Sequence, residues 1–197
     1  MFLPAPSTSL LRRGLYLEYL TLGWNVVGAA IIIIAAIKAR SVALAGFGID
    51  SLIEIFASVI VVWQLKNIGH DRERTALRLI GGAFFALALY VLVQAAYTLL
   101  TRSHPAQSPG GIMWLAATLV AMLLLSWGKL ITGRQLGNSV LLTEARVTLI
   151  DGILAAAVLL GLVLNALFGW WWADPLAGLV IVYYGIKEGL HAWREEE

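Results

Sequence analysis

Long apolar stretches make up most of the chain, and short polar segments separate them. Six of these stretches have about the 20 residues that an α-helix needs to cross a bilayer. They lie at approximately 14–37, 42–65, 77–101, 112–132, 142–166 and 175–193. Within lipid, a spanning segment must satisfy its own backbone hydrogen bonds, and this favours helices. The pattern therefore predicts an all-α integral membrane protein with six transmembrane helices.

Polar residues at the ends of these stretches predict where some helices begin. Ser41 directly precedes the second stretch and is a suitable N-cap. Asp174 and Pro175 precede the sixth stretch, where the acid is expected to cap the helix and the proline to occupy its first turn. The segment SHPAQSPGG (103–111) has the proline and glycine content of a connecting turn.

The composition narrows the class of protein further. Hydrophobic residues make up 60% of the chain and charged residues 13%, whereas a soluble domain carries about 25% charge. A soluble enzyme, a disordered chain and a nucleic-acid-binding protein are therefore disfavoured. Because there is no cysteine, disulfides and thiolate metal sites are excluded. We expect residues 1–197 to form one transmembrane domain in a plasma or inner membrane, with no cytoplasmic C-terminal domain.

The basic residues predict the orientation of the helices, because cytoplasmic loops carry an excess of Lys and Arg. With the N-terminus in the cytoplasm, ten basic residues fall on the inner side: Arg12, Arg13, Lys66, Arg72, Arg74, Arg78, Lys129, Arg134, Lys187 and Arg194. Three fall on the outer side: Lys38, Arg40 and Arg102. We therefore expect both termini to be cytoplasmic.

Most of the acids lie in loops or near helix ends, but five lie inside apolar stretches: Glu18, Asp50, Glu54, Glu144 and Asp151. Burying an ionised acid at the centre of a bilayer costs at least about 2.5–3.5 kcal/mol, so such residues need a partner or a function. Asp50 and Glu54 are four residues apart, which places both on one face of a helix. Their expected depth matches that of Asp151, and the sequence pattern places no basic residue there.

Carboxylates this close repel one another unless a cation or a proton lies between them. The three acids Asp50, Glu54 and Asp151 therefore suggest a site that exchanges a metal cation for protons, and a protonated structural network is the alternative. Glu18 shares a helical face with Thr21 and Asn25, and Glu144 shares one with Thr148. For Glu18 and Glu144, a role in the transport site and a role in a structural network both stay open. Glu144 has Arg146 and Arg134 as candidate partners near the inner surface.

Three segments resemble the cation diffusion facilitator family of divalent metal exporters. SVALAGFGIDSLIEIFAS (41–58) is similar to the second helix of that family, and Asp50 and Glu54 match its pair of metal ligands. NSVLLTEARVTLIDGILAAAVLLGLVL (138–164) is similar to its fifth helix, where Asp151 matches the family aspartate and Val147 replaces a histidine. GWWWADPLAGLVIVYYGIKEGL (169–190) is similar to its sixth helix.

The resemblance implies a cation-efflux-type bundle that exports a divalent metal ion in exchange for protons by alternating access. Zn²⁺ is the expected substrate, although a site of oxygen ligands without the histidine favours harder ions such as Mn²⁺. The candidates for a further ligand are Thr148, Glu144, Asn25, Glu18 and water. No prosthetic group is expected. The resemblance also implies a homodimer, formed here through the helices.

Two other functions use features found in this sequence. A non-transporting scaffold or regulatory subunit fits the missing histidine and the missing cytoplasmic domain. An intramembrane aspartyl protease also uses acids from two helices, but GFGID (46–50) departs from the protease signature because Ile49 intervenes. We therefore expect a transport protein and no enzyme.

Overall fold

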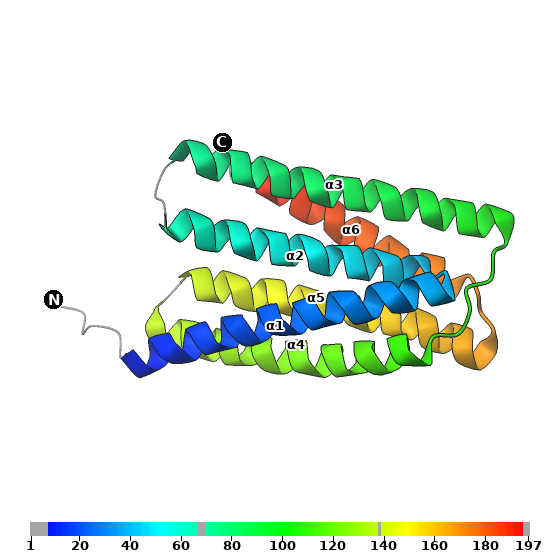
Figure 1. Ribbon diagram of the computed structural model, residues 1–197, viewed down its shortest axis with the longest axis horizontal. Helices are drawn as coiled ribbons and strands as arrows, with labels where there is room; N and C mark the ends of the chain where they lie inside the picture. Colours follow the sequence, from blue (N-terminus) through cyan, green and yellow to red (C-terminus); the bar gives the residue numbers. More distant parts are fainter. Residues whose placement is uncertain (1–7, 67–69, 138, 195–197) are drawn as a thin grey trace.

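Six α-helices joined by short connections form the chain in the computed structural model (Figure 1). The structure describes residues 8–66, 70–137 and 139–194, and within them all side chains except those at 8, 11, 57–66, 70–80, 139–140, 143 and 192–194. The helices are α1 (Thr8–Ala39), α2 (Val42–Lys66), α3 (His70–Thr101), α4 (Pro109–Leu136), α5 (Ser139–Phe168) and α6 (Ala173–Arg194). The predicted all-helical fold is confirmed. The helices extend beyond most of the predicted apolar spans, because polar turns continue them past the apolar segment.

Capping residues mark the start of α2 and both ends of α4. The Ser41 hydroxyl accepts a hydrogen bond of 3.1 Å from the backbone N–H of Leu44, so Ser41 is the N-cap of α2 as predicted. Ser108 accepts a similar bond of 3.3 Å from Gly111 at the start of α4. Gly137 ends α4 in the left-handed conformation, with φ of +60°, which glycine adopts without strain.

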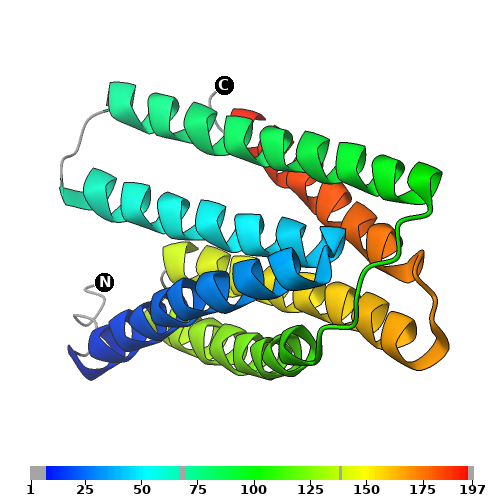
Figure 2. The ribbon, with the colours of Figure 1, turned by 45° about the vertical axis from the view of Figure 1, so that its right-hand side comes forward.

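The chain passes back and forth so that α1 begins and α6 ends at the same end of the bundle (Figure 1), which we call the terminal end. The opposite end carries the α1–α2, α3–α4 and α5–α6 connections. Helices α3 and α6 lie side by side along one edge, and α4 and α5 pack together on the other side (Figure 2). Helix α2 lies between these two groups and contacts α1, α3, α5 and α6. Side chains on α2 can therefore contact side chains from four other helices.

The bundle has a packed apolar interior and an apolar outside. Ile32, Leu44, Val91, Val158 and Ile181 are buried where the helices meet. Many large apolar side chains point outward, and Leu100 is 84% exposed. Four helical stretches are long and apolar enough to cross a bilayer: Arg12–Ala39, Gly81–Thr101, Pro109–Leu136 and Glu144–Phe168. An outward surface of this kind is suited to lipid, as expected of a multi-pass membrane protein.

Candidate metal centre

Three acidic side chains from two helices meet inside the bundle. Asp50 and Glu54 lie one turn apart on α2, and Asp151 faces them from α5. One oxygen of each carboxylate lies within 4.8 Å of the other two. Around an ion with oxygen ligands at about 2.1 Å, tetrahedral oxygens are about 3.4 Å apart. The three carboxylate oxygens, at most 4.8 Å apart, therefore need to draw together by at most about 1.4 Å to share one ion.

Burying three charged carboxylates together costs free energy unless a cation or protons neutralise them. Asp50 and Asp151 are 4% and 2% exposed, and Glu54 is half-buried. The Oδ1 atom of Asp151 is buried and has no hydrogen-bond partner among the described residues. A buried carboxylate oxygen without a donor loses its hydration and gains nothing in return. An ion bound between the three acids would supply the missing interaction.

The side chain of Asn25 connects α1 to this cluster. Its Nδ2 donates a hydrogen bond of 2.9 Å to Oε2 of Glu54, and Asn25 itself is buried. The bond shows that α1 approaches α2 closely enough for Asn25 to adjoin the site. Because the bond fixes one oxygen of Glu54, it orients that carboxylate relative to Asp50 and Asp151.

The other three candidate ligands lie together around Lys129 of α4. The Lys129 ammonium donates hydrogen bonds of 2.9 Å to Oε2 of Glu18 and 3.1 Å to Oγ1 of Thr148. It also lies 3.8 Å from Oε2 of Glu144. The partner of Glu144 is therefore Lys129 rather than Arg146 or Arg134.

The prediction that places Lys129 at the inner surface is wrong, because its side chain is completely buried and bonded to Glu18 and Thr148. We expected Lys129 to be an inner-surface residue, since it lies close to the end of the fourth apolar stretch. The helix continues to Leu136, which places Lys129 more than a turn inside it. Among the other basic residues used for orientation, Lys66, Arg72, Arg74, Arg78 and Arg194 lie outside the described side chains.

Val147 occupies the position where the family resemblance expects a histidine. It lies one turn before Asp151 on α5 and is 36% exposed. An isopropyl group offers no lone pair, so this position contributes no ligand. The described side chains at the acidic cluster therefore present oxygen ligands only.

Asp174 does not act as the cap of its own helix, contrary to the prediction. It is the second residue of α6 and is fully buried. Its carboxylate accepts hydrogen bonds from the Ser41 hydroxyl and from the backbone N–H groups of Val42 (2.9 Å) and Ala43 (3.4 Å). Asp174 therefore caps α2, where the unpaired N–H groups and the helix dipole favour a negative charge.

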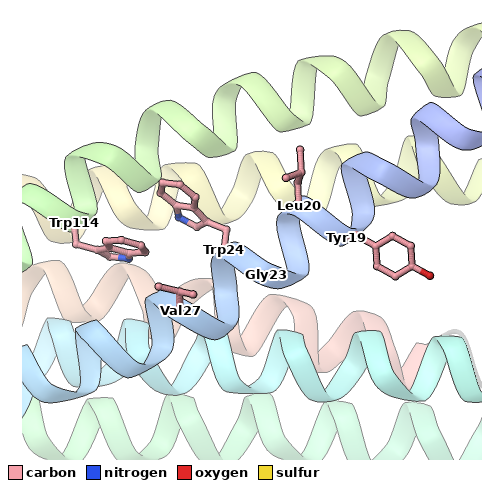
Figure 3. Close-up of a pocket in the computed structure, with 6 residues that line it drawn as sticks. All are labelled: Tyr19, Leu20, Gly23, Trp24, Val27 and Trp114. Atoms are coloured by element: carbon pink, nitrogen blue, oxygen red, sulfur yellow. The ribbon is translucent and has the colours of Figure 1, made fainter.

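A pocket between α1 and α4 is unsuited to a metal cation. It has a volume of about 310 Å³ and no carboxylate in its wall (Figure 3). The residues that line it are Tyr19, Leu20, Gly23, Trp24, Val27 and Trp114. The Trp24 and Trp114 rings stack with their centroids 5.0 Å apart, and Trp24 Nε1 donates to Thr118 Oγ1 at 3.1 Å. The acidic cluster remains the candidate ion site.

Lys129 and the cross-helix role of Asp174 are the two features that the sequence analysis missed. For Lys129 a signal was present, because Ser126, Lys129 and Gly133 recur at helical spacing within an apolar stretch and mark a buried face. For Asp174 there was no such signal. The sequence pattern of an acid beside a proline is the same whether the acid caps its own helix or a neighbouring helix.

Comparison with known proteins agrees with this architecture. The family described as the cation efflux transmembrane domain matches residues 19–196. Transmembrane protein 163 of Xenopus laevis is 26% identical over 89% of this chain and 66% of its own length. Metal tolerance protein 4 of Oryza sativa subsp. japonica is 25% identical over 82% of this chain and 44% of its own length.

The cadmium, cobalt and zinc/H(+)-K(+) antiporter of Bacillus subtilis (strain 168) is 26% identical over 66% of this chain. The match covers 42% of that antiporter, so this chain spans less than half the length of two of these relatives. The family match extends over nearly the whole chain and includes α2, α5 and α6. The chain belongs to the cation efflux family of metal transporters.

Proposed function

We propose that the chain transports a divalent metal cation, Zn²⁺ or a similar ion, by alternating access of a site formed by Asp50, Glu54 and Asp151. The convergence of three carboxylates from α2 and α5 within 4.8 Å carries this proposal. No chemical step on a substrate is needed, because the site only exchanges cations.

Protons are the proposed counter-ions. When a metal ion leaves, three buried carboxylates remain close together, and binding protons relieves their repulsion. Deprotonated carboxylates are required for metal binding, so the two cations compete for the same oxygens. The name of the Bacillus antiporter, which includes H(+), supports this exchange.

We also propose that both termini are cytoplasmic, that the protein lies in the cell membrane, and that it forms a homodimer. The proposed direction is export from the cytoplasm, as the resemblance to divalent metal exporters implies. Dimerisation through the helices is compatible with α3, where Gly82 is exposed and a Cβ at that position would have no atom within 4 Å. Small residues of this kind allow membrane helices to approach closely.

The test is metal uptake into proteoliposomes that contain the purified chain and an indicator dye. We expect Zn²⁺ flux that an opposing proton gradient accelerates, and competition by Mn²⁺, Co²⁺, Fe²⁺ and Cd²⁺ would rank the ions. Asp50→Asn and Asp151→Asn are each expected to lower the flux at least ~100-fold, because a neutral amide oxygen binds a divalent ion more weakly than a carboxylate and removes one negative charge from the site.

Ser51→Ala is the matched control, because Ser51 is buried next to Asp50 in sequence and its hydroxyl donates to Phe47 O on the same helix at 3.1 Å. Its flux should equal that of the wild type. Normal flux in the Asp50→Asn and Asp151→Asn variants would refute the site. Absence of flux for every divalent ion would instead support the scaffold alternative.

A further inference from the structure

Lys129 places the end of a basic side chain inside the bundle. Its side chain is 0% exposed, and its ammonium contacts groups from two other helices, Glu18 on α1 and Thr148 on α5. A buried ammonium is stable only when carboxylates and hydrogen-bond acceptors replace its hydration. Here it has both.

The acids around Lys129 resemble an ion site. Glu18 Oε2 and Glu144 Oε2 lie 2.9 and 3.8 Å from the ammonium nitrogen and approach it from different helices. Lys129 also donates to the Thr148 hydroxyl, which in turn donates to the Glu144 backbone carbonyl at 2.8 Å. Glu18 Oε1 is buried and has no hydrogen-bond partner among the described residues. Two carboxylates and a hydroxyl around one positive centre are the oxygen ligands that a divalent ion prefers.

This group adjoins the site of the proposed function. Thr148 precedes Asp151 by three residues, so both lie on the same face of α5, about one turn apart. Glu18 and Glu144 have side chains that are 36% exposed, whereas Lys129 between them is fully buried. Lys129 therefore lies beside the candidate ion site and holds the neighbouring pair of acids, Glu18 and Glu144.

We propose that the Lys129 ammonium is a built-in cation that fills a second site formed by Glu18, Glu144 and Thr148, and so limits the chain to one bound divalent ion. The location of that one ion at Asp50, Glu54 and Asp151 rests on the proposed function. The filling of the second site by Lys129 does not depend on the proposed function.

The test counts Zn²⁺ ions bound per chain in nanodiscs by equilibrium dialysis and elemental analysis. We expect one ion for the wild type and for Lys129→Arg, which keeps the positive charge. Lys129→Met removes the charge and keeps a similar apolar stem, so it should bind two. Adding Glu18→Gln and Glu144→Gln to Lys129→Met should return the count to one. A count of one for folded Lys129→Met would overturn the proposal.

A second background separates this proposal from the proposed function. In Asp50→Asn/Asp151→Asn, the count should be zero with Lys129 present and one with Lys129→Met. A wild type that binds no ion, together with a Lys129→Met variant that binds one, would refute the transport site and support the role of Lys129.

Thermal unfolding covers the case in which Lys129→Met is unstable. Since a ligand stabilises the state that binds it, millimolar Mn²⁺ should raise the melting temperature of Lys129→Met in the Asp50→Asn/Asp151→Asn background. The further change Glu18→Gln should abolish that increase. If Mn²⁺ does not stabilise Lys129→Met, the second site does not exist and the proposal fails.

Discussion

The side-chain amide of Asn25 on α1 donates a hydrogen bond of 2.9 Å to Oε2 of Glu54 on α2. This bond ties a helix without a predicted primary ligand to the acidic cluster. It holds Glu54 in one orientation, and Glu54 is the half-buried member of the three acids. The geometry of the proposed ion site therefore depends on the contact between α1 and α2.

Replacing Asn25 should weaken metal binding. A hydrogen bond to a charged group contributes about 1.5–3 kcal/mol, so Asn25→Ala is expected to raise the Kd for Zn²⁺ about ten-fold or more. Isothermal titration of the protein in detergent measures this. Thr21→Ala is the control, because the Thr21 hydroxyl donates to Leu17 O on its own helix at 3.0 Å. An unchanged Kd for Asn25→Ala would show that the orientation of Glu54 does not matter.

Acid should weaken metal binding. A metal ion binds the deprotonated carboxylates of Asp50, Glu54 and Asp151, so protons compete as the pH falls. We expect the Kd for Zn²⁺ to rise at least ~10-fold between about pH 7.5 and 5.5. Glu54→Gln should show a smaller rise, because one competing carboxylate has been removed. A Kd that does not change with pH would argue against carboxylate ligands.

Introducing histidine at position 147 should change the ion preference. Val147 lies one turn from Asp151 and is 36% exposed, so the chain has room for a larger side chain there. Imidazole suits Zn²⁺, whereas oxygen ligands suit Mn²⁺. Val147→His is therefore expected to raise the ratio of Zn²⁺ to Mn²⁺ affinity about ten-fold. Competition flux measures the ratio, and Val147→Leu, which adds volume without a ligand, should leave it unchanged.

Removing the carboxylate of Asp174 should destabilise the fold. Asp174→Ala leaves the Val42 and Ala43 N–H groups at the start of α2 without their acceptor. We expect a loss of about 2–3 kcal/mol in the free energy of unfolding, since the lost bonds involve a buried charge. Denaturation in detergent, followed by circular dichroism, measures the change.

Ser41→Ala provides a second measurement of the same contact. The effects of Ser41→Ala and Asp174→Ala should be less than additive, because the two side chains share one interaction. Glu188→Ala, at a half-buried acid of the same helix, is the control and should lower the free energy of unfolding by less than Asp174→Ala does. A similar cost for Glu188→Ala and Asp174→Ala would contradict the capping role.

The amino-acid pattern by itself determined the six helices and the face that Asp50 shares with Glu54. Hydropathy and helical spacing are local properties, so a short stretch of sequence is enough to reveal them. The position of Asp151 on α5 was also evident from the cost of an acid inside an apolar stretch.

Only the tertiary structure decided which side chains meet. Lys129 pairs with Glu18 and Glu144, Asn25 holds Glu54, and Asp174 caps a helix distant in sequence. Each of these contacts joins two helices whose adjacency depends on how the whole bundle packs. A local pattern shows that a buried polar residue needs a partner, but the partner is fixed only when the helices come together.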